Sequence, residues 1–281
     1  MTALKKQFKN EHFNIIHRKY DTSPPNNIFT LHIHDFYELY FFLQGDITYN
    51  IEGKKYKINT GDLLKINNEE LHRPIFNSDN IYERITVHFN PWYICKYNTE
   101  EYSLLSCFKD RNPGQYNKIT KNKVIENYFQ KISKYMQKKS KEIPIMIETL
   151  FIQLLIKINE LFHKQKKKGK DTTNYNDRVL KIINYINKNL EKRITLNLLA
   201  KKFALDKYYL SHLFKENTGF SLLQYVINKK IMKAKGLLSS GFSCGEVCDK
   251  LSFGDYSNFY KTFKKKLGVS PSEYKKKNKI E

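Results

Sequence analysis

The sequence predicts an α+β fold with several domains: an N-terminal β-barrel or β-sandwich followed by two helices, and a C-terminal domain made only of helices. Three observations support this. Short segments rich in aromatic and β-branched residues fill residues 28–90, helical periodicity begins after Pro91, and one phrase occurs twice near the C-terminus. A length of 281 residues leaves room for more than one core.

The β domain is expected over residues 1–118. Turn residues such as Gly45-Asp46 and Thr60-Gly61-Asp62 separate its apolar segments, and this spacing is typical of an all-β sandwich or barrel. The segments expected to form strands are IFTLHIH, ELYFFL, DITYNI, KKYKI, DLLKI and RITVHF.

Two helices are expected next, over 124–136 and 145–162, within a predicted helical dimerisation segment at 119–164. The second carries an apolar stripe at spacings of three and four. This stripe could pack against the first helix and the β domain, or form the seam of a homodimer. Its residues are Ile147, Leu150, Phe151, Leu154, Ile158 and Leu161. Residues 165–176 are polar and charged, and we expect a linker there.

The repeated phrase lies in the predicted C-terminal domain, residues 177–281. HLFKENTGFSLLQY begins at His212, and KTFKKKLGVSPSEY begins at Lys261. Each copy belongs to a short helix, a tight turn and a second helix. The expected caps are Thr195, Asp206 and Gly219 in the first copy, and Ser243 with Glu246, Asp255 and Gly268 in the second. This is the helix-turn-helix plan, whose second helix enters the DNA major groove.

Charge favours a polyanionic partner. Residues 176–281 hold 22 Lys and Arg against 9 Asp and Glu, and the whole chain has a formal net charge of +22. The side chains expected to face DNA are Lys207, Tyr208, Ser211, His212 and Lys215 in the first copy, and Tyr256, Ser257, Asn258, Lys261, Lys264 and Lys265 in the second. The alternative for each is an ordinary solvated helix face.

This pattern resembles the DNA-binding domain of AraC/XylS-type transcription regulators. The shared residues are Tyr-Leu-Ser-x-Leu-Phe-Lys-x3-Gly-x-Ser in the first unit and Phe-Lys-x3-Gly-x-Ser-Pro-x2-Tyr in the second. The resemblance implies two recognition helices on successive major grooves. It places base-facing side chains at Tyr208, Ser211 and His212, then at Tyr256, Ser257, Asn258 and Lys261. The sequence departs from the family at Lys230 and Lys275, where Arg is frequent, and at Ser252, where Gly is frequent.

The other informative stretch is HIHDFYELYFFLQG. In an extended strand, His32, His34 and Glu38 share one face, and His72 follows later in the chain. The set resembles the cupin pattern, and it also resembles the sensor domains of AraC-type regulators. In cupin enzymes these residues hold a metal ion, whereas in the sensor domains the resemblance implies a small effector, commonly a sugar. A purely structural role is the third interpretation. We predict an effector site without a metal, a cofactor or catalytic residues.

Other features exclude several classes of protein. No apolar run is long enough to span a membrane, no signal peptide is evident, and the four cysteines form no disulfide framework, so a cytoplasmic protein is expected. GFSCG at 241–245 matches the hydrolase nucleophile elbow, but a helix is predicted before it where the elbow needs a strand. The predicted function is sequence-specific regulation of transcription on double-stranded DNA. A metal-dependent cupin enzyme with a DNA-binding tail and a non-specific DNA binder are the alternatives.

Overall fold

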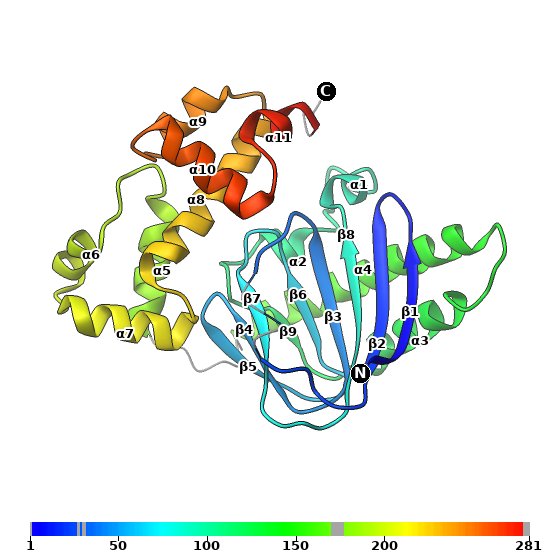
Figure 1. Cartoon of the computed structure of the whole chain (residues 1–281). Helices are drawn as coiled ribbons and strands as arrows, with labels where there is room; N and C mark the ends of the chain where they lie inside the picture. Colours follow the sequence, from blue (N-terminus) through cyan, green and yellow to red (C-terminus); the bar gives the residue numbers. More distant parts are fainter. Residues whose placement is uncertain (1, 27–28, 30–31, 170–176, 278–281) are drawn as a thin grey trace. The chain divides into compact units, whose positions relative to one another are not determined.

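The computed structural model describes residues 2–26, 29, 32–169 and 177–277 (Figure 1). Contacts divide the chain into two compact units, Met1–Asn174 and Tyr175–Glu281. The first unit is rich in sheet and the second is helical, as the sequence predicts. Among the helices of the described residues, none has the length and apolar character needed to span a bilayer.

The N-terminal unit contains two antiparallel sheets that remain open and do not close into a barrel. The six-stranded sheet has the spatial order β1 (Thr2–Lys9), β2 (Phe13–Tyr20), β8 (Tyr82–Phe89), β3 (Tyr37–Gln44), β6 (Leu63–Ile66) and β9 (Lys118–Ile119). The three-stranded sheet has the order β5 (Lys54–Ile58), β4 (Ile47–Ile51) and β7 (His72–Phe76).

The observed strands differ from the sequence prediction in two places. The β1–β2 hairpin was not predicted, because its polar, lysine-rich sequence lacks an apolar pattern; lysines suit β1, which is the edge strand of its sheet. The strand expected over IFTLHIH is also wrong. Within its described residues, only His32 pairs, through an isolated bridge to His72.

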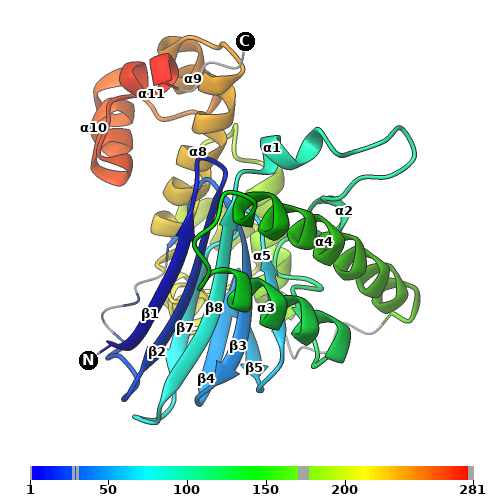
Figure 2. The same ribbon diagram turned by 90° about the vertical axis from the view of Figure 1, so that its right-hand side faces the viewer.

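Alternation along the central strands sends side chains to two different cores. From β3, Leu39 and Phe41 pack toward α3 (Lys123–Tyr135) and α4 (Ile143–Lys167), which cover one face of the large sheet (Figure 2). Tyr40 and Phe42 point the other way, into a second cluster shared with the small sheet. The interior between the two sheets is therefore separate from the helix-covered core.

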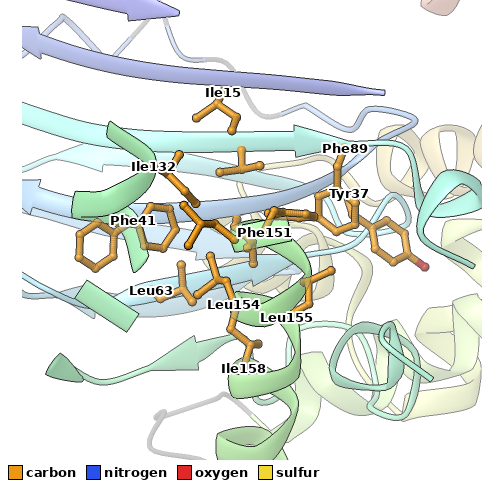
Figure 3. Packing of buried hydrophobic residues seen from close by; sticks show 14 of the residues in the cluster. Ile15, Tyr37, Phe41, Leu63, Phe89, Ile132, Phe151, Leu154, Leu155 and Ile158 are labelled. Carbon is orange, nitrogen blue, oxygen red and sulfur yellow. The ribbon is translucent and has the colours of Figure 1, made fainter. Parts of the chain in front are cut away.

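The apolar stripe of α4 belongs to the first of these cores (Figure 3). Ile147, Phe151, Leu154 and Ile158 are completely buried within one chain, and Leu161 packs against them. The first alternative for the stripe is therefore the one observed, because these side chains are not accessible to a second copy. Helix α4 also continues to Lys167, into the segment predicted as linker; residues 170–176 of that segment lie outside the described residues.

Short helices α1 (Pro91–Cys95) and α2 (Ser106–Lys109) complete the N-terminal unit. The C-terminal unit contains seven helices among its described residues. They are α5 (Asp177–Lys188), α6 (Leu196–Phe203), α7 (Lys207–Thr218), α8 (Leu222–Ser239), α9 (Cys244–Lys250), α10 (Tyr256–Leu267) and α11 (Pro271–Lys277).

The predicted caps of these helices are confirmed. Asp206 accepts hydrogen bonds from two backbone amides of α7, and Asp255 accepts one from α10. Ser243 and Glu246 form a reciprocal capping box at the start of α9, so GFSCG is a helix start that follows another helix. Gly219 and Gly268 end α7 and α10 in the left-handed conformation, with φ of 80° and 76°.

Candidate functional site

The two helix-turn-helix units, α6–α7 and α9–α10, share one turn geometry. Ala204 after α6 and Ser252 after α9 both adopt the left-handed conformation, with φ of 51° and 48°. An aspartate then caps the second helix in each unit. Counted from the left-handed residue to this aspartate, the second turn has one residue more, Gly254, at φ 95°.

The first helix-turn-helix unit places its predicted DNA-facing residues on one side of α7. Leu210 and Phe214 are completely buried on the opposite side and hold the helix in place. Tyr208 is 73% exposed and its ring lies 4.3 Å from that of His212. The remaining predicted residues are exposed or half-buried on the same face: Lys207, Ser211 and Lys215.

The second unit does the same with α10, where Phe259 and Phe263 are completely buried. All predicted residues of this helix are exposed: Tyr256, Ser257, Asn258, Lys261, Lys264 and Lys265. One is already engaged within the chain. Asn258 donates from Nδ2 to the carbonyl oxygen of Phe253 at 3.0 Å. Its side-chain amide is therefore less available to a DNA base than the polar groups of the other predicted residues.

The departures from the family pattern have visible substitutes. Lys230, only 5% exposed, donates from Nζ to the Ser252 carbonyl oxygen at 3.1 Å, and burial lowers the pKa of its ammonium group. Lys275 donates to the Gly241 carbonyl oxygen at 2.9 Å. The Ser252 hydroxyl donates to the Glu191 carbonyl oxygen at 2.5 Å. Single bonds to carbonyls thus replace the forked contacts that an arginine would make.

In the N-terminal unit, the histidines converge on one carboxylate. Glu38 is 4% exposed, and its Oε2 lies 3.0 Å from Nε2 of His34, 3.2 Å from that of His88 and 3.7 Å from that of His72. Burial alone would raise the pKa of Glu38, but the charge of His88 and the hydrogen bonds with His34 and His88 hold it well below its usual value. The His32 ring centroid lies 4.4 Å from that of His72.

Proton positions make this cluster suited to a ligand. His34 donates from Nδ1 to the Phe36 carbonyl oxygen at 2.9 Å, and His72 donates to that of Glu70 at 2.8 Å. Nε2 of either ring can therefore donate to Glu38 only when both ring nitrogens are protonated, and in a neutral imidazole it presents a lone pair toward a carboxylate that also carries lone pairs. Such acceptors are satisfied by a proton, a metal cation or a donor hydroxyl placed between them.

The donor set fits a transition metal ion. Ligand atoms of His32, His34 and His72 lie within 4.8 Å of one another, as do those of His34, Glu38 and His88. Imidazoles whose other nitrogen donates to a carbonyl are typical of metal ligands, and Nε2 of His72 is buried without a hydrogen-bond partner. Hydroxyl groups of a small molecule fit the same atoms, since they can donate to Glu38 and to the imidazoles.

Sequence reasoning missed two residues of this interior, both from β8. His88 pairs with Glu38 across the β3–β8 ladder, and Arg84 lies four residues earlier on the same face. The signal was present: in YERITVHF, Tyr82, Arg84, Thr86 and His88 alternate with the apolar Ile85, Val87 and Phe89. What the sequence lacked was the pairing of β8 with β3.

Comparisons with known proteins agree with both halves of this description. A model of the helix-turn-helix domain matches residues 199–277, and a model of the AraC-like ligand binding domain matches residues 15–155. The transcriptional activator RhaS of Mannheimia succiniciproducens is 26% identical over 257 residues, covering 89% of this chain and 90% of that protein. The activator RhaR of Escherichia coli K12 is 23% identical over 258 residues, covering 90% and 89%.

Further matches cover little more than a third of this chain. An uncharacterized response regulatory protein of Staphylococcus epidermidis is 31% identical over 101 residues, which are 36% of this chain and only 40% of that relative. Among solved structures, the C-terminal domain of AraT, a response regulator from Geobacillus stearothermophilus, is 27% identical. It covers 38% of this chain and 89% of that domain, with a TM-score of 0.37.

Together, a ligand-binding sheet domain and a paired helix-turn-helix domain define a ligand-responsive regulator of transcription. Because the ligand-binding model alone matches just over half of the residues, the family is also clear. The chain belongs to the AraC-type transcription regulators.

Proposed function

We propose that this regulator binds a specific double-stranded operator in the cytoplasm, and that a small molecule bound between the sheets of the N-terminal unit changes this binding. Helices α7 and α10 would enter two major-groove segments about one helical turn apart. The main support for this proposal is that the two helix-turn-helix units share one turn geometry. Each has a left-handed residue, an aspartate cap, and a second helix with one buried and one exposed face.

The effector site of this proposal is the polar cluster between the sheets. Its predicted members are His32, His34, Glu38 and His72, and His88 is added from the structure. A ligand that changes DNA binding must have different affinities for two arrangements of the protein. We propose a regulator and not an enzyme, since the full-length relatives named above are transcriptional activators.

A homodimer stays part of the proposal, but with a different surface from the stripe of α4. Apolar side chains remain exposed on α3 and α4: Val124 is 48% exposed and Ile145 is 65% exposed. We expect Ile145→Asp to shift full-length protein from dimer to monomer in light scattering. Ile147, two residues further along α4 and fully buried, would instead affect folding when changed.

The experiment that tests DNA recognition is selection of bound duplexes from a random pool, using full-length protein at about 0.15 M salt, where non-specific binding is weak. We expect a motif of two blocks whose centres lie about one helical turn, 10–10.5 base pairs, apart. An unstructured pool with no enriched sequence would favour the non-specific binder, since specific proteins usually gain about 10³-fold or more.

The effector site is tested by a thermal-shift screen of neutral and charged metabolites on three proteins: wild type, His34→Ala and His17→Ala. His17 is the matched control, because it lies on the same sheet and bonds Glu83 at 2.7 Å, away from the Glu38 cluster. Compounds that stabilise wild type and His17→Ala but not His34→Ala support the proposal. Equal stabilisation of all three proteins would place the ligand elsewhere.

A further inference from the structure

The interior between the sheets contains a buried arginine that the cluster around Glu38 does not explain. We propose that the effector carries an acidic group, a carboxylate or a phosphate, and that Arg84 binds this group with help from Arg18. The inference rests on the proposed effector site and names the chemical class of its ligand.

Arg84 is 9% exposed, and none of the ion pairs among the described residues involves it. Its Nη1 is buried without a hydrogen-bond partner. Burying a charge without a counter-charge is costly, and proteins normally pair such groups. Arg111, in the same unit, shows the usual solution: its guanidinium is fully buried and forms a two-bond pair with Glu70, at 2.6 and 2.7 Å.

Aromatic rings take the place of an acid around Arg84. Its guanidinium carbon lies 5.0 Å from the ring centroid of Tyr82, 5.4 Å from that of Phe29 and 6.0 Å from that of Tyr40. Burial alone would lower the pKa of Arg84, but the nearby tyrosine hydroxyls, led by Tyr82, raise it overall, so the group stays charged. Cation–π contacts hold a cation in place but leave its N–H donors available.

A second arginine lies directly opposite. Arg18 of β2 is the register partner of Arg84 in β8, as Tyr20 is of Tyr82, and the stacked rings of these tyrosines show that the pairs share a face. Nε of Arg18 is also buried without a partner. Like charges directly opposite each other destabilise a sheet. Two adjacent guanidinium groups with unused donors therefore form a receptor for an anion.

The acidic residues of the sheet do not fill this role. Glu38 is engaged by the histidines, and its partner His88 lies four residues along β8 from Arg84, about 13 Å at the rise of a strand. Glu83 alternates to the opposite face and pairs with His17 and Lys19. A small molecule of about this length could place its acid at Arg84 and its hydroxyl groups at the Glu38 cluster.

The test uses full-length protein, thermal unfolding and matched probes at constant ionic strength in chloride. Gluconate is compared with sorbitol, and glucose 6-phosphate with glucose, so each pair differs mainly in the acidic group. Inorganic phosphate is tested separately, to show whether the site binds the free ion. We expect an anionic member to raise the Tm of wild type by several degrees while its neutral counterpart does not. If no probe with an acidic group changes Tm at 100-fold the concentration of the protein, the inference is overturned.

Arg84→Met separates a ligand-binding arginine from a structural one. We expect its Tm in chloride alone to equal or exceed that of wild type, because an unpaired buried charge is removed and the apolar stem is kept. Its affinity for the anionic probe should fall at least about tenfold, and Arg84→Lys should lie between, since lysine keeps the charge but not the fork. A lower Tm in chloride with an unchanged response to the anion would overturn the inference.

Arg73→Met is the matched control. Arg73 also has a buried Nε without a partner, but it alternates with the inward-facing His72 and Pro74 of β7 and so lies on the other face of the small sheet. Its response to anions should equal that of wild type, and loss of that response would contradict the assignment to Arg84. If a neutral compound instead stabilises wild type and Arg84→Met equally but not His34→Ala, the effector site stands and only its preference for an anion is wrong.

Discussion

The two helix-turn-helix units are alike in backbone and unlike in surface. Both have a left-handed turn residue, an aspartate cap and a glycine end. Helix α7, however, offers two lysines and the glutamate Glu216, whereas α10 offers Lys261 and the run Lys264–Lys266 without an acid. The shared features are those that form the turn, and the differing ones face outward. We therefore expect α10 to supply more of the phosphate affinity, and α7, with Tyr208 and His212, more of the base reading.

The turn of the second helix-turn-helix unit also makes more polar contacts with the residues around it. Ser252 donates to the Glu191 carbonyl oxygen, Lys230 donates to Ser252, and Lys233 pairs with Glu191 at 2.9 Å. Ala204, the equivalent turn residue of the first unit, has no side chain able to hydrogen-bond. Four measurements test whether the two helix-turn-helix units differ in this way.

The largest effect on stability should come from the buried phenylalanines of the two helix-turn-helix units. Phe214 and Phe263 occupy equivalent positions and are both completely buried. Changing either to Ala should lower the free energy of unfolding of the helical unit by about 3–5 kcal/mol. Urea unfolding can be followed by circular dichroism, while fluorescence of Trp92, the single tryptophan, reports the N-terminal unit as an internal control. Costs that differ more than twofold would show that the units are not equally packed.

The stability of the helical unit should depend on pH through Lys235, which lies next to Tyr274 of α11. Burial lowers the pKa of Lys235, which is 4% exposed and lies 5.5 Å from the Tyr274 ring centroid, to about 8. Below pH 8 both folded and unfolded states are protonated, and the cost of burying the charge is present in full. Between about 8 and 10.4 the unfolded state binds more protons, so stability rises with pH, by up to about 3 kcal/mol.

Lys235→Met tests this effect, because the variant cannot titrate at this position but keeps most of the apolar volume. Its unfolding free energy should lack the rise above pH 8 that wild type shows. The difference in slope is the measurement, since other groups contribute to both proteins equally. Parallel profiles would mean that Lys235 keeps an ordinary pKa in the folded state.

DNA binding should separate the surfaces by salt dependence. Replacing Lys261, Lys264 and Lys265 by Gln should reduce the slope of log K against log salt by up to about 2.7, at about 0.9 per lost phosphate contact. The pair Lys207 and Lys215 should reduce it by at most about 1.8. In Lys261→Ala alone, loss of about 1–3 kcal/mol on the selected operator but not on scrambled duplex would mark a base contact. Equal losses on both duplexes would mark a phosphate contact.

The smallest effect concerns the turns. A left-handed conformation costs a non-glycine residue about 1–2 kcal/mol, so Ala204→Gly should stabilise the helical unit by about 1 kcal/mol. Ser252→Gly should be close to neutral, because relief of strain is offset by loss of a hydrogen bond worth about 0.5–1.5 kcal/mol. If both changes stabilise equally, the Ser252–Glu191 bond contributes nothing.

Sequence reasoning succeeded where interactions are local. The caps at Asp206, Asp255 and Ser243 were predicted because each side chain bonds amides two or three residues away. The buried face of each recognition helix followed from spacing, since helical neighbours are set by the 3.6-residue turn. The family resemblance rested on these same local features.

It failed where the partner is distant. The lysine-rich β1–β2 hairpin has little apolar pattern of its own, and it is recognisable only from the pairing of β2 with β8. The stripe of α4 was equally consistent with a neighbouring copy or with its own sheet, because periodicity identifies an apolar face but not what covers it.

Local sequence patterns are thus sufficient to indicate a sheet domain followed by two capped helix-turn-helix units, with a basic surface on the second helix of each. Which side chains meet between the sheets depends instead on how the strands pair. Strand alternation allows Glu38, Arg84 and His88 to face the same way, but the register of β3 and β2 on β8 brings His88 to Glu38 and sets Arg18 against Arg84. Register depends on contacts between residues far apart in the chain, so no local pattern could reveal it.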